Sequence, residues 1–422
     1  MKTSHPRCWA QLAGAVVALL AGCERAPSTT SGPLPQRGYL WQRHWSPAVP
    51  AALRAAQTHL QGIVLLGAEI EWVEKTPRVV RANVDWKAVK AAGLPCSIAL
   101  RVAPISHPDA EALQSIASVA HSLDTEARAH QVELEEFQLD YDCAQKKLAQ
   151  YRAWLPAVRA AVRPTRFVIT ALPSWLEEKE FAALIEEVDG YVLQVHSIPM
   201  ADAGEARLCD IAAARRWVRQ AAKLHRPFAV ALPTYRCTAG YDEAGKLLGV
   251  AMDSVQPAWP PGTRRLELAA EADPIADLVQ EWQRARPAEL NELIWYRVPV
   301  ASDTRNWRWP TLSAVMAGRK PARHFEVVAE GGNPLDLALR NSGESDDDRP
   351  GRVMANWSDG ELIAADALAG WNVETQTQSA IFTVQGDRLR LPPGAVRNIG
   401  WLRYSGPVIP KFSVQYEKKL VR

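Results

Sequence analysis

The sequence predicts an α/β protein, a TIM-type (β/α)8 barrel followed by a small antiparallel β-sandwich. From Tyr39 to about Val315, a short β-branched or aromatic run alternates with a longer segment of helical periodicity, eight times. Eight such repeats fit a closed parallel barrel better than an open doubly wound sheet. Beyond the last repeat the pattern changes to short alternating runs broken by turn residues, which is typical of a sandwich. We therefore expect a barrel over residues 38–320 and a sandwich over residues 321–422.

The barrel elements follow in order along the chain. The predicted strands are YLWQRHW (39–45), GIVLL (62–66), SIALRV (97–102), FQLDYD (137–142), RFVITAL (166–172), GYVLQVH (190–196), PFAVALP (227–233) and LIWYRVP (293–299). Helical stretches between them include 109–130, 144–161, 175–187, 209–224 and 274–287. Because no G-x-G-x-x-G follows a strand, a dinucleotide-binding fold is excluded. The long segment 234–292 contains QPAWPPGT, and long loops after barrel strands usually build the functional site.

The predicted sandwich strands are short and separated by turn signals. They are FEVVAEG, LDLALRNSG, RVMANWSDG, AIFTVQGDRLRL and NIGWLRYSG. An acidic run lies between the second and third of them, with Glu344, Asp346, Asp347 and Asp348. Such a run is compatible with a calcium site, but a solvated hairpin loop is the simpler interpretation, and we expect the loop.

The N-terminus has the layout of an export signal. Lys2 and Arg7 precede the apolar stretch 10–20, and no acidic residue interrupts it. This stretch is too short to span a bilayer core, which needs about 20 residues. We therefore predict a signal peptide over residues 1–22.

The apolar stretch ends in Leu20-Ala21-Gly22-Cys23, which resembles the lipobox of bacterial lipoproteins. The resemblance implies cleavage before Cys23 and a diacylglycerol on its thiol, so that acyl chains anchor the protein in a membrane. Glu24 follows the cysteine, which favours the outer membrane, facing the periplasm, over retention at the inner membrane. Residues 23–37 are rich in Pro, Ser and Thr and are predicted to form a flexible tether.

Composition excludes several classes of function. The 49 Lys and Arg balance 47 Asp and Glu, so the basic surplus of nucleic-acid binders is missing, and we expect no nucleic-acid partner. Neither C-x-x-C nor a His/Cys cluster occurs, so no metal site and no cofactor are predicted. In an oxidising compartment, at least one structural disulfide is expected among the cysteines of the mature chain, with the pairing open. These cysteines are Cys96, Cys143, Cys209 and Cys237.

The fourth strand carries the predicted catalytic residues. In FQLDYD, Gln138, Asp140 and Asp142 share one face, and the apolar opposite face meets the helices, so both aspartates point into the barrel mouth. Two carboxylates this close should separate in pKa, which suits acid and nucleophile or base roles. Asp140 has an equally weighted structural interpretation, as an anion held by Arg101 or Arg297, which we also expect to point inward.

Polar and aromatic residues at other strand ends predict a sugar-binding mouth. Gln194 and His196 share a face at the end of the sixth strand, where they could hydrogen-bond hydroxyl groups. Flat aromatic faces beside carboxylates and amides suit pyranose rings, and no P-loop suggests phosphate. The aromatic candidates are Trp41, Trp45, Trp72, Trp175, Tyr235, Trp295 and Tyr296, although each alone is more often a packing residue. The predicted ligand contacts are Gln194, His196, Arg297, Trp295, Tyr235 and Trp41.

The segments FQLDYDC, GYVLQVHS, LCD (208–210), AARRWV and FAVALPTYRC resemble a bacterial family, domain of unknown function 3142. The resemblance covers roughly residues 39–320 and implies a glycoside-hydrolase-like TIM barrel without an established activity. The chitinase-like pattern D-x-x-D-x-D-x-E would need acids where this chain has Phe137 and Ala144, so that general acid is missing. The second carboxylate stays unassigned among Glu69, Glu71, Asp202 and Asp210.

Two functions are compatible with these patterns. The first is a lipid-anchored cell-envelope glycoside hydrolase acting on a poly- or oligosaccharide, with Asp142 as nucleophile or general base and Asp140 tuning it. The alternative is a non-catalytic glycan-binding or envelope-assembly lipoprotein whose barrel has lost its acid. A second carboxyl group facing Asp142 across the mouth would favour the enzyme.

Overall fold

The structure of the chain is a computed structural model. It describes residues 28–73, 76–105, 109–196, 198, 207–252, 257–346, 350–368, 370–385 and 390–416. The predicted signal peptide, Cys23, Asp202, Asp347 and Asp348 lie outside these ranges. Within the described part of the chain, no helix combines the length and apolar character needed to cross a membrane.

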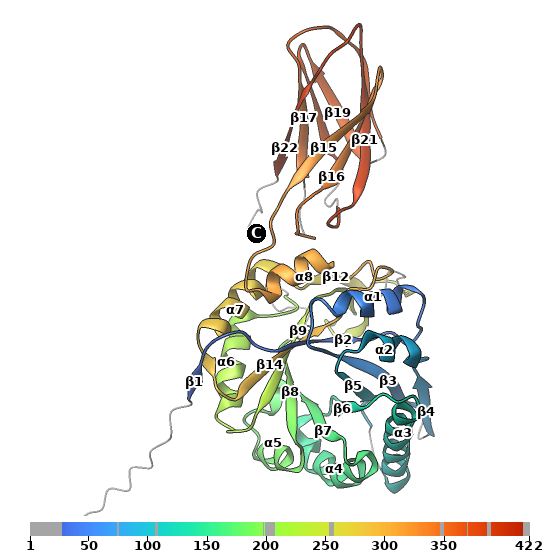
Figure 1. Cartoon of the computed structure of the whole chain (residues 1–422), viewed down its shortest axis with the longest axis vertical. Coiled ribbons are helices and arrows are strands. Elements are labelled where there is room, and N and C mark those ends of the chain that lie inside the picture. Colours follow the sequence, from blue (N-terminus) through green and yellow to red (C-terminus); the bar gives the residue numbers. More distant parts are fainter. Residues whose placement is uncertain are drawn as a thin grey trace, which may run out of the picture.

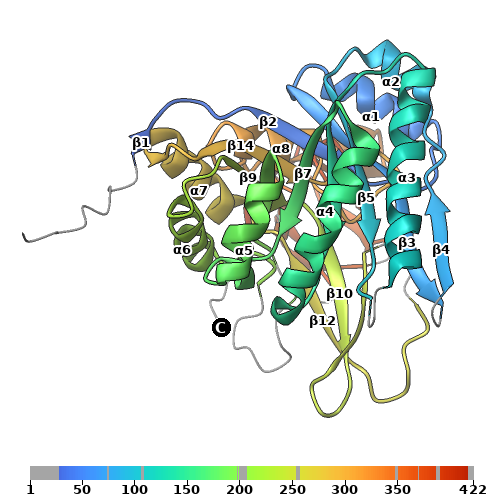
Figure 2. The ribbon, with the colours of Figure 1, turned by 90° about the horizontal axis from the view of Figure 1, so that it is seen from below.

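Eight parallel strands of the described chain close into a barrel (Figures 1 and 2). They are β2 (Gln36–Leu40), β3 (Gly62–Val73), β5 (Cys96–Val102), β6 (Leu134–Tyr141), β7 (Arg166–Ala171), β8 (Gly190–Gln194), β9 (Phe228–Pro233) and β14 (Leu290–Tyr296). Closure comes from β2, which pairs with β14 on one side and β3 on the other. β4 (Thr76–Arg81) extends β3 as an antiparallel hairpin. The predicted (β/α)8 barrel is therefore confirmed.

The helices surround this barrel (Figure 2). They are α1 (Ala48–Ala56), α2 (Trp86–Ala92), α3 (Ala110–Ala129), α4 (Leu148–Val162), α5 (Lys179–Leu184), α6 (Ile211–Ala222), α7 (Ala272–Arg284) and α8 (Trp309–Met316). Asp85, Asp109 and Asp210 begin three of them as N-caps whose carboxylates accept backbone N–H bonds. Short 3-10 turns are η1 (Gln145–Lys147), η2 (Pro173–Trp175) and η3 (Ile185–Glu187).

The N-terminal part of the described chain differs from the prediction. The first barrel strand runs from Gln36 to Leu40 rather than over 39–45, and residues 28–37 are held on the barrel instead of forming a flexible tether. β1 (Thr29–Thr30) pairs with β13 (Arg286–Pro287), and the Arg286 Nη1 donates to the Gly32 carbonyl at 2.7 Å. Leu34 is 4% exposed. Burial of this leucine stabilises the ordered segment, which its polar composition does not reveal.

The barrel interior is layered and has a charged floor at the N-terminal ends of the strands. At the N-terminal ends of the strands, Arg37 forms ion pairs with Glu136 at 2.8 Å and Glu292 at 2.5 Å. The layer above it is aliphatic and consists of Val64, Ala99, Val168, Val192, Ala229, Ala231 and Ile294. The larger cavity of the barrel lies toward the C-terminal ends of the strands, and a small pocket lies beside Arg37 at the floor.

The long loop after β9 folds into a small sheet of its own. β10 (Arg236–Tyr241) lies between β11 (Leu247–Ala251) and β12 (Arg264–Ala269), and this sheet projects from the C-terminal end of the barrel (Figure 2). The Trp of QPAWPPGT, Trp259, packs flat on Gly240, where a Cβ would come within 2.4 Å of its ring. Gly240 is therefore needed for this close approach.

The C-terminal domain is the predicted sandwich. Its strands are β15 (Phe325–Gly331), β16 (Leu335–Asn341), β17 (Pro350–Asn356), β18 (Leu362–Ala367), β19 (Trp371–Gln376), β20 (Ser379–Val384), β21 (Val396–Tyr404) and β22 (Lys411–Tyr416). They form two four-stranded antiparallel sheets in the orders β15-β16-β21-β18 and β19-β20-β17-β22 (Figure 1). Asp346, expected in a solvated loop, is instead fully buried beside the barrel.

The cysteines contradict one expectation. Cys96, Cys143, Cys209 and Cys237 are all buried and all free, so the predicted disulfide is wrong for these four. They lie on separate elements of the barrel and its C-terminal loops, where each fills the core as a small apolar side chain.

Candidate active site

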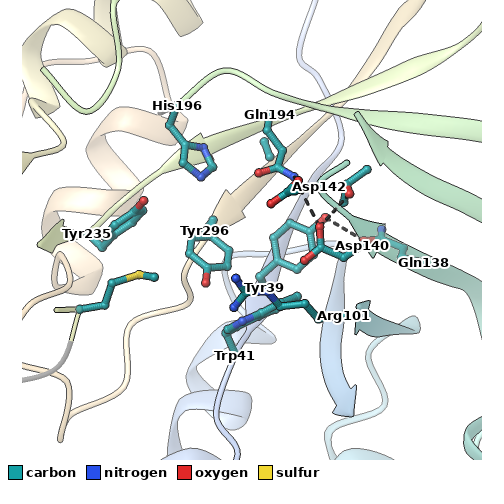
Figure 3. Close-up of a pocket in the computed structure, with 13 residues that line it drawn as sticks. Tyr39, Trp41, Arg101, Gln138, Asp140, Asp142, Gln194, His196, Tyr235 and Tyr296 are labelled. Atoms are coloured by element: carbon teal, nitrogen blue, oxygen red, sulfur yellow. Dashed lines mark hydrogen bonds between the residues drawn. The ribbon is translucent and has the colours of Figure 1, made fainter. Parts of the chain in front are cut away.

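A cavity of about 680 Å³, counted to its open mouth, lies at the C-terminal ends of the barrel strands. One wall is polar and comes from β5, β6, β7 and β8, whereas the other is aromatic and comes from β2, β14 and the segments after β8 and β9 (Figure 3). The lining residues are Tyr39, Trp41, Arg101, Gln138, Asp140, Asp142, Thr170, Gln194, His196, Ala231, Tyr235, Met252 and Tyr296.

The polar wall centres on two carboxylates from one strand. Asp140 lies in β6 and Asp142 follows its end, and the two-residue period of the strand directs both into the cavity. The Thr170 hydroxyl donates to Asp140 Oδ1 at 2.7 Å. The Gln194 Nε2 lies 3.3 Å from Asp142 Oδ1 and 3.5 Å from Asp140 Oδ1, so one amide bridges the pair (Figure 3).

Burial makes this pair hard to ionise fully. It raises the pKa of Asp142 to about 7, a shift that the neighbouring Asp140 increases and that Arg101 and Gln194 oppose. Burial also raises the pKa of Asp140, against the hydrogen bond from Thr170 and the charge of Arg101. Because both pKa values lie above the ordinary range and the groups interact, the pair retains a proton near neutral pH.

A third carboxylate lies behind the cavity wall. Glu69 on β3, Arg101 on β5 and Asp140 on β6 are aligned across three adjacent strands. Arg101 Nη1 is 3.3 Å from Glu69 Oε1, and Arg43 binds the other oxygen of Glu69. Burial lowers the pKa of Arg101, but the surrounding carboxylates, Asp140 foremost, raise it overall. Arg101 therefore pairs with Glu69 and acts on Asp140 through its charge.

The opposite wall is a continuous aromatic surface. Tyr39, Trp41 and Tyr296 contact one another edge to face with ring centroids 5.4 to 5.7 Å apart, and Tyr235 adds a further edge contact with Tyr296 at 5.5 Å. His196 stacks on Tyr296 at 5.8 Å. This wall presents apolar ring faces and edges directly across from the carboxylates (Figure 3).

His196 adds a polar atom to the aromatic wall. Burial lowers its pKa to about 4, against the smaller effect of the Ala231 carbonyl, so the imidazole is neutral at physiological pH. Its Nδ1 is buried and has no hydrogen-bond partner among the residues that the structure describes. A ligand hydroxyl in the cavity could supply that partner.

The structure brings together most, but not all, of the predicted site. Asp140, Asp142, Gln194, His196, Tyr235 and Trp41 all line the cavity. Trp295 does not, because it is fully buried on the outer face of β14, where its Nε1 donates to Gln36 at 2.8 Å. Arg297 does not either, and it pairs with Asp303 at 2.8 Å. Ile294 and Tyr296 occupy the inward face of β14, so the residues between and after them point away from the axis.

The remaining candidates lie outside the cavity. Trp175 is buried and donates to the Cys143 carbonyl at 3.1 Å. Glu71 pairs with the exposed Arg78, and Asp210 caps α6. Trp45 and Trp72 pack against the barrel core without lining the site.

Sequence reasoning missed four lining residues, which are Tyr39, Thr170, Ala231 and Met252. Tyr39 alternates with Trp41, and Thr170 alternates with Val168 on β7, so the period of two contained a signal for both. Met252 comes from the segment after β11, and no local pattern points to it.

Comparisons with known proteins give two family matches and several similar solved structures. Residues 93–301 match the family model "Domain of unknown function (DUF3142)", and residues 326–405 match "Domain of unknown function (DUF8456)". No curated protein matches the chain. Similar solved structures include the spore cortex-lytic enzyme SleL from Bacillus cereus, at 11% identity and a TM-score of 0.48, with 69% of this chain and 75% of that chain covered. A chitinase from Chromobacterium violaceum is similar at 11% identity and a TM-score of 0.45, with coverages of 68% and 98%.

Proposed function

We propose that this chain, whose residues 93–301 match the DUF3142 family model, is a glycoside hydrolase acting on a poly- or oligosaccharide in its barrel cavity. One observation carries the proposal: a buried carboxylate pair that retains a proton near neutral pH faces a wall of aromatic rings across the cavity. Carboxylates of this kind are the groups that cleave glycosidic bonds.

The cavity has the features that a sugar ring requires. Small-molecule sites commonly combine apolar surface with a few convergent polar groups. Here Trp41 and Tyr296 offer ring surfaces, while Gln194 and the unpaired Nδ1 of His196 offer hydrogen bonds for hydroxyl groups. Both kinds of contact lie within one cavity, which supports binding of a polar ring with apolar faces.

Asp142 has the protonation state of a general acid. With a pKa of about 7 it still carries its proton over much of the neutral range. Burial raises the pKa of Asp140 as well, and Thr170 and Arg101 oppose that shift. In the proposed reaction, the proton of Asp142 passes to the glycosidic oxygen as the bond from that oxygen to the anomeric carbon breaks. Water adds to the anomeric carbon, and its proton returns to the carboxylate pair. The raised pKa thus favours an acid role for Asp142 over the nucleophile or base role expected from sequence.

One observation favours a second candidate, a non-catalytic glycan-binding protein. Among the described residues that line the cavity, the carboxyl groups are those of Asp140 and Asp142, which come from the same strand. The wall across from them is aromatic, so the described chain places no second carboxyl group opposite Asp142. Glycan binding without cleavage is the result that this alternative predicts.

The test is product release and binding on a panel of envelope and dietary polysaccharides, with soluble protein from residue 24 onward. We expect one glycan to be bound and shortened. Trp41→Ala should weaken that binding by about tenfold, because it removes a large ring face from the cavity. The matched control is Trp217→Ala on α6, which removes a partly buried tryptophan away from the site. Binding without any cleavage would select the second candidate, and no binding to any glycan would contradict both.

We also propose that Cys23 carries the lipid that attaches the protein to the envelope, at the outer membrane and facing the periplasm. The lipobox-like Leu20-Ala21-Gly22-Cys23 supports this. Ser28, five residues further on, is already bonded to the barrel through the Ala288 amide at 2.8 Å. Five extended residues reach at most about 18 Å, so the anchor would hold the barrel close to the bilayer.

Metabolic labelling with an alkyne fatty acid checks the anchor. Wild-type protein should incorporate the label and sediment with outer-membrane vesicles, whereas Cys23→Ala should do neither. Cys8→Ala, which removes the other N-terminal cysteine, should label like the wild type. Equal labelling of the Cys23→Ala variant would disprove this attachment site.

A further inference from the structure

The sandwich is joined to the barrel by buried polar contacts. Asp346 of the sandwich domain is fully buried, and its Oδ2 accepts hydrogen bonds from the Arg308 backbone N–H at 2.6 Å and from the Thr311 hydroxyl at 3.2 Å, at the start of α8. Thr311 also donates to the Glu344 carbonyl at 2.5 Å. The sandwich therefore meets the barrel next to α8, as Figure 1 shows.

Arg390 extends this junction to the loop that follows β14. It lies 3.6 Å from the Asp346 carboxylate, which orients its guanidinium. From there its Nη1 donates to the Thr304 carbonyl, and its Nη2 donates to the Asn306 carbonyl at 3.2 Å. One side chain of the sandwich domain thus holds two backbone carbonyls of a barrel loop, a geometry that the planar fork of arginine suits.

Asn306 connects that loop to two barrel strands. It is 1% exposed, and its Nδ2 donates to the Arg297 and Val298 carbonyls at 2.9 and 3.1 Å, just after β14. Its Oδ1 accepts from the Thr234 hydroxyl at 2.6 Å, just after β9. Asn306 also forms an antiparallel bridge with Tyr235. Asn306 therefore adds a buried amide link between the ends of β9 and β14, which also pair directly.

Two rings of the aromatic wall sit at these strand ends. Tyr296 is the last residue of β14, and its carbonyl accepts from the Thr234 N–H at 2.8 Å. Tyr235 follows Thr234 and contacts Tyr296 edge to face. We propose that Arg390 is a positioning residue: through Thr304 and Asn306, the sandwich holds Tyr235 and Tyr296 in the arrangement that forms the aromatic wall.

Loss of the Arg390 side chain should disturb the aromatic wall of the cavity and leave the carboxylate wall in place. In the described part of the chain, Asp140 and Asp142 are hydrogen-bonded to Thr170 and Gln194, which lie on β7 and β8 and not on the loop that Arg390 holds. Loss of Arg390 should therefore move the rings and leave the titration of the carboxylate pair unchanged. The consequence for glycan affinity rests on the proposed function, whereas the consequence for ring position does not.

The experiment compares Arg390→Ala with Arg340→Ala in soluble protein from residue 24 onward. Arg340 is the matched control, because it also belongs to the sandwich and forms an exposed ion pair with Glu326 at 3.2 Å. The first readout is the ring signals of ¹³C-labelled Tyr235 and Tyr296 in solution NMR, assigned with Tyr→Phe variants. The second is the affinity for a glycan identified by the panel, and the third is the pH midpoint of its cleavage.

We expect Arg390→Ala, but not Arg340→Ala, to shift both ring signals and to weaken glycan binding by about five- to tenfold, because a small displacement of positioning groups is costly. The pH midpoint should stay that of the wild type. If Arg390→Ala fails to fold, Asp346→Asn takes its place, because it keeps the side-chain size and removes the charge that orients Arg390. Unchanged ring signals in a folded variant would overturn the proposal.

The two proposals fail in different ways. If no glycan binds to the wild type, the proposed function fails, and the ring signals alone decide whether Arg390 positions the wall. If glycan binds and the ring signals shift without a loss of affinity, the sandwich does not position these rings for the ligand, and the inference is overturned while the hydrolase stands.

Discussion

Replacing Asp142 by Asn should lower the rate of glycan cleavage about a thousandfold, because an amide cannot deliver the proton that the leaving oxygen needs. Binding should persist, since Asn keeps the size of the side chain and one acceptor oxygen for Gln194. The measurement is kcat on the glycan that the panel identifies, together with affinity from calorimetry. A loss in kcat with little change in affinity marks an interaction that matters in the transition state.

The pKa of Asp142 predicts how glycan cleavage and stability change with pH. Asp142 must be protonated to act as the acid, and its pKa is about 7, so wild-type cleavage should fall as the pH rises through about 7. The same raised pKa affects stability. The folded protein binds the Asp142 proton more tightly than the unfolded chain does. The contribution of this proton to the free energy of unfolding is therefore complete below about pH 4 and is lost as the pH rises through about 7. At pH 8 the Asn variant should therefore be at least as stable as the wild type.

The control for Asp142 is Asp210→Asn. Asp210 lies in a loop before α6 and caps that helix by accepting from the Ala213 N–H at 3.1 Å, a role that asparagine can also fill. This variant should retain full cleavage and an unaltered pH profile. A wild-type kcat in Asp142→Asn, or an equal loss of kcat in both variants, would show that Asp142 is not the general acid.

Replacing Arg37 by Gln should lower the free energy of unfolding by about 3 to 5 kcal/mol, because it leaves the buried Glu292 without its cation and Glu136 with Arg166 alone, at 3.3 Å. Arg37 contacts both Glu136 and Glu292, and its side chain is 8% exposed. Burial already raises the pKa of Glu292, and Arg37 opposes that shift. Without Arg37 the pKa should rise further, so the loss of stability should be larger at pH 8 than at pH 5. Urea unfolding followed by fluorescence at both pH values measures it.

Arg78→Gln is the matched surface control. Arg78 pairs with Glu71 on the β3–β4 hairpin, where both side chains are well exposed. Its removal should lower the free energy of unfolding by no more than about 0.5 kcal/mol, because exposed ion pairs contribute little to stability. A loss for Arg37→Gln as small as that of Arg78→Gln would show that the floor does not depend on this cation.

Local patterns in the sequence determined the fold class and part of the site. Short β-branched or aromatic runs marked the barrel strands, including GIVLL and SIALRV, because strands buried on both faces are apolar along their whole length. The two-residue period of a strand placed Asp140, Asp142 and Gln194 inside the barrel mouth. Parallel strands then bring their C-terminal ends to one rim, so residues at several strand ends could be assigned to one cavity before any contact was known.

Tertiary structure decided what depends on partners distant in the chain. Pairing with neighbouring strands sets which residues of β14 point inward, so Tyr296 lines the cavity while Trp295 and Arg297 do not. Arg101 pairs with Glu69 rather than with Asp140, and Asp346 is buried because the sandwich docks beside α8. The four barrel cysteines remain unpaired because the fold places them on separate elements and loops. Orientation and pairing across elements depend on packing energies summed over the whole fold, and no local period in the sequence records them.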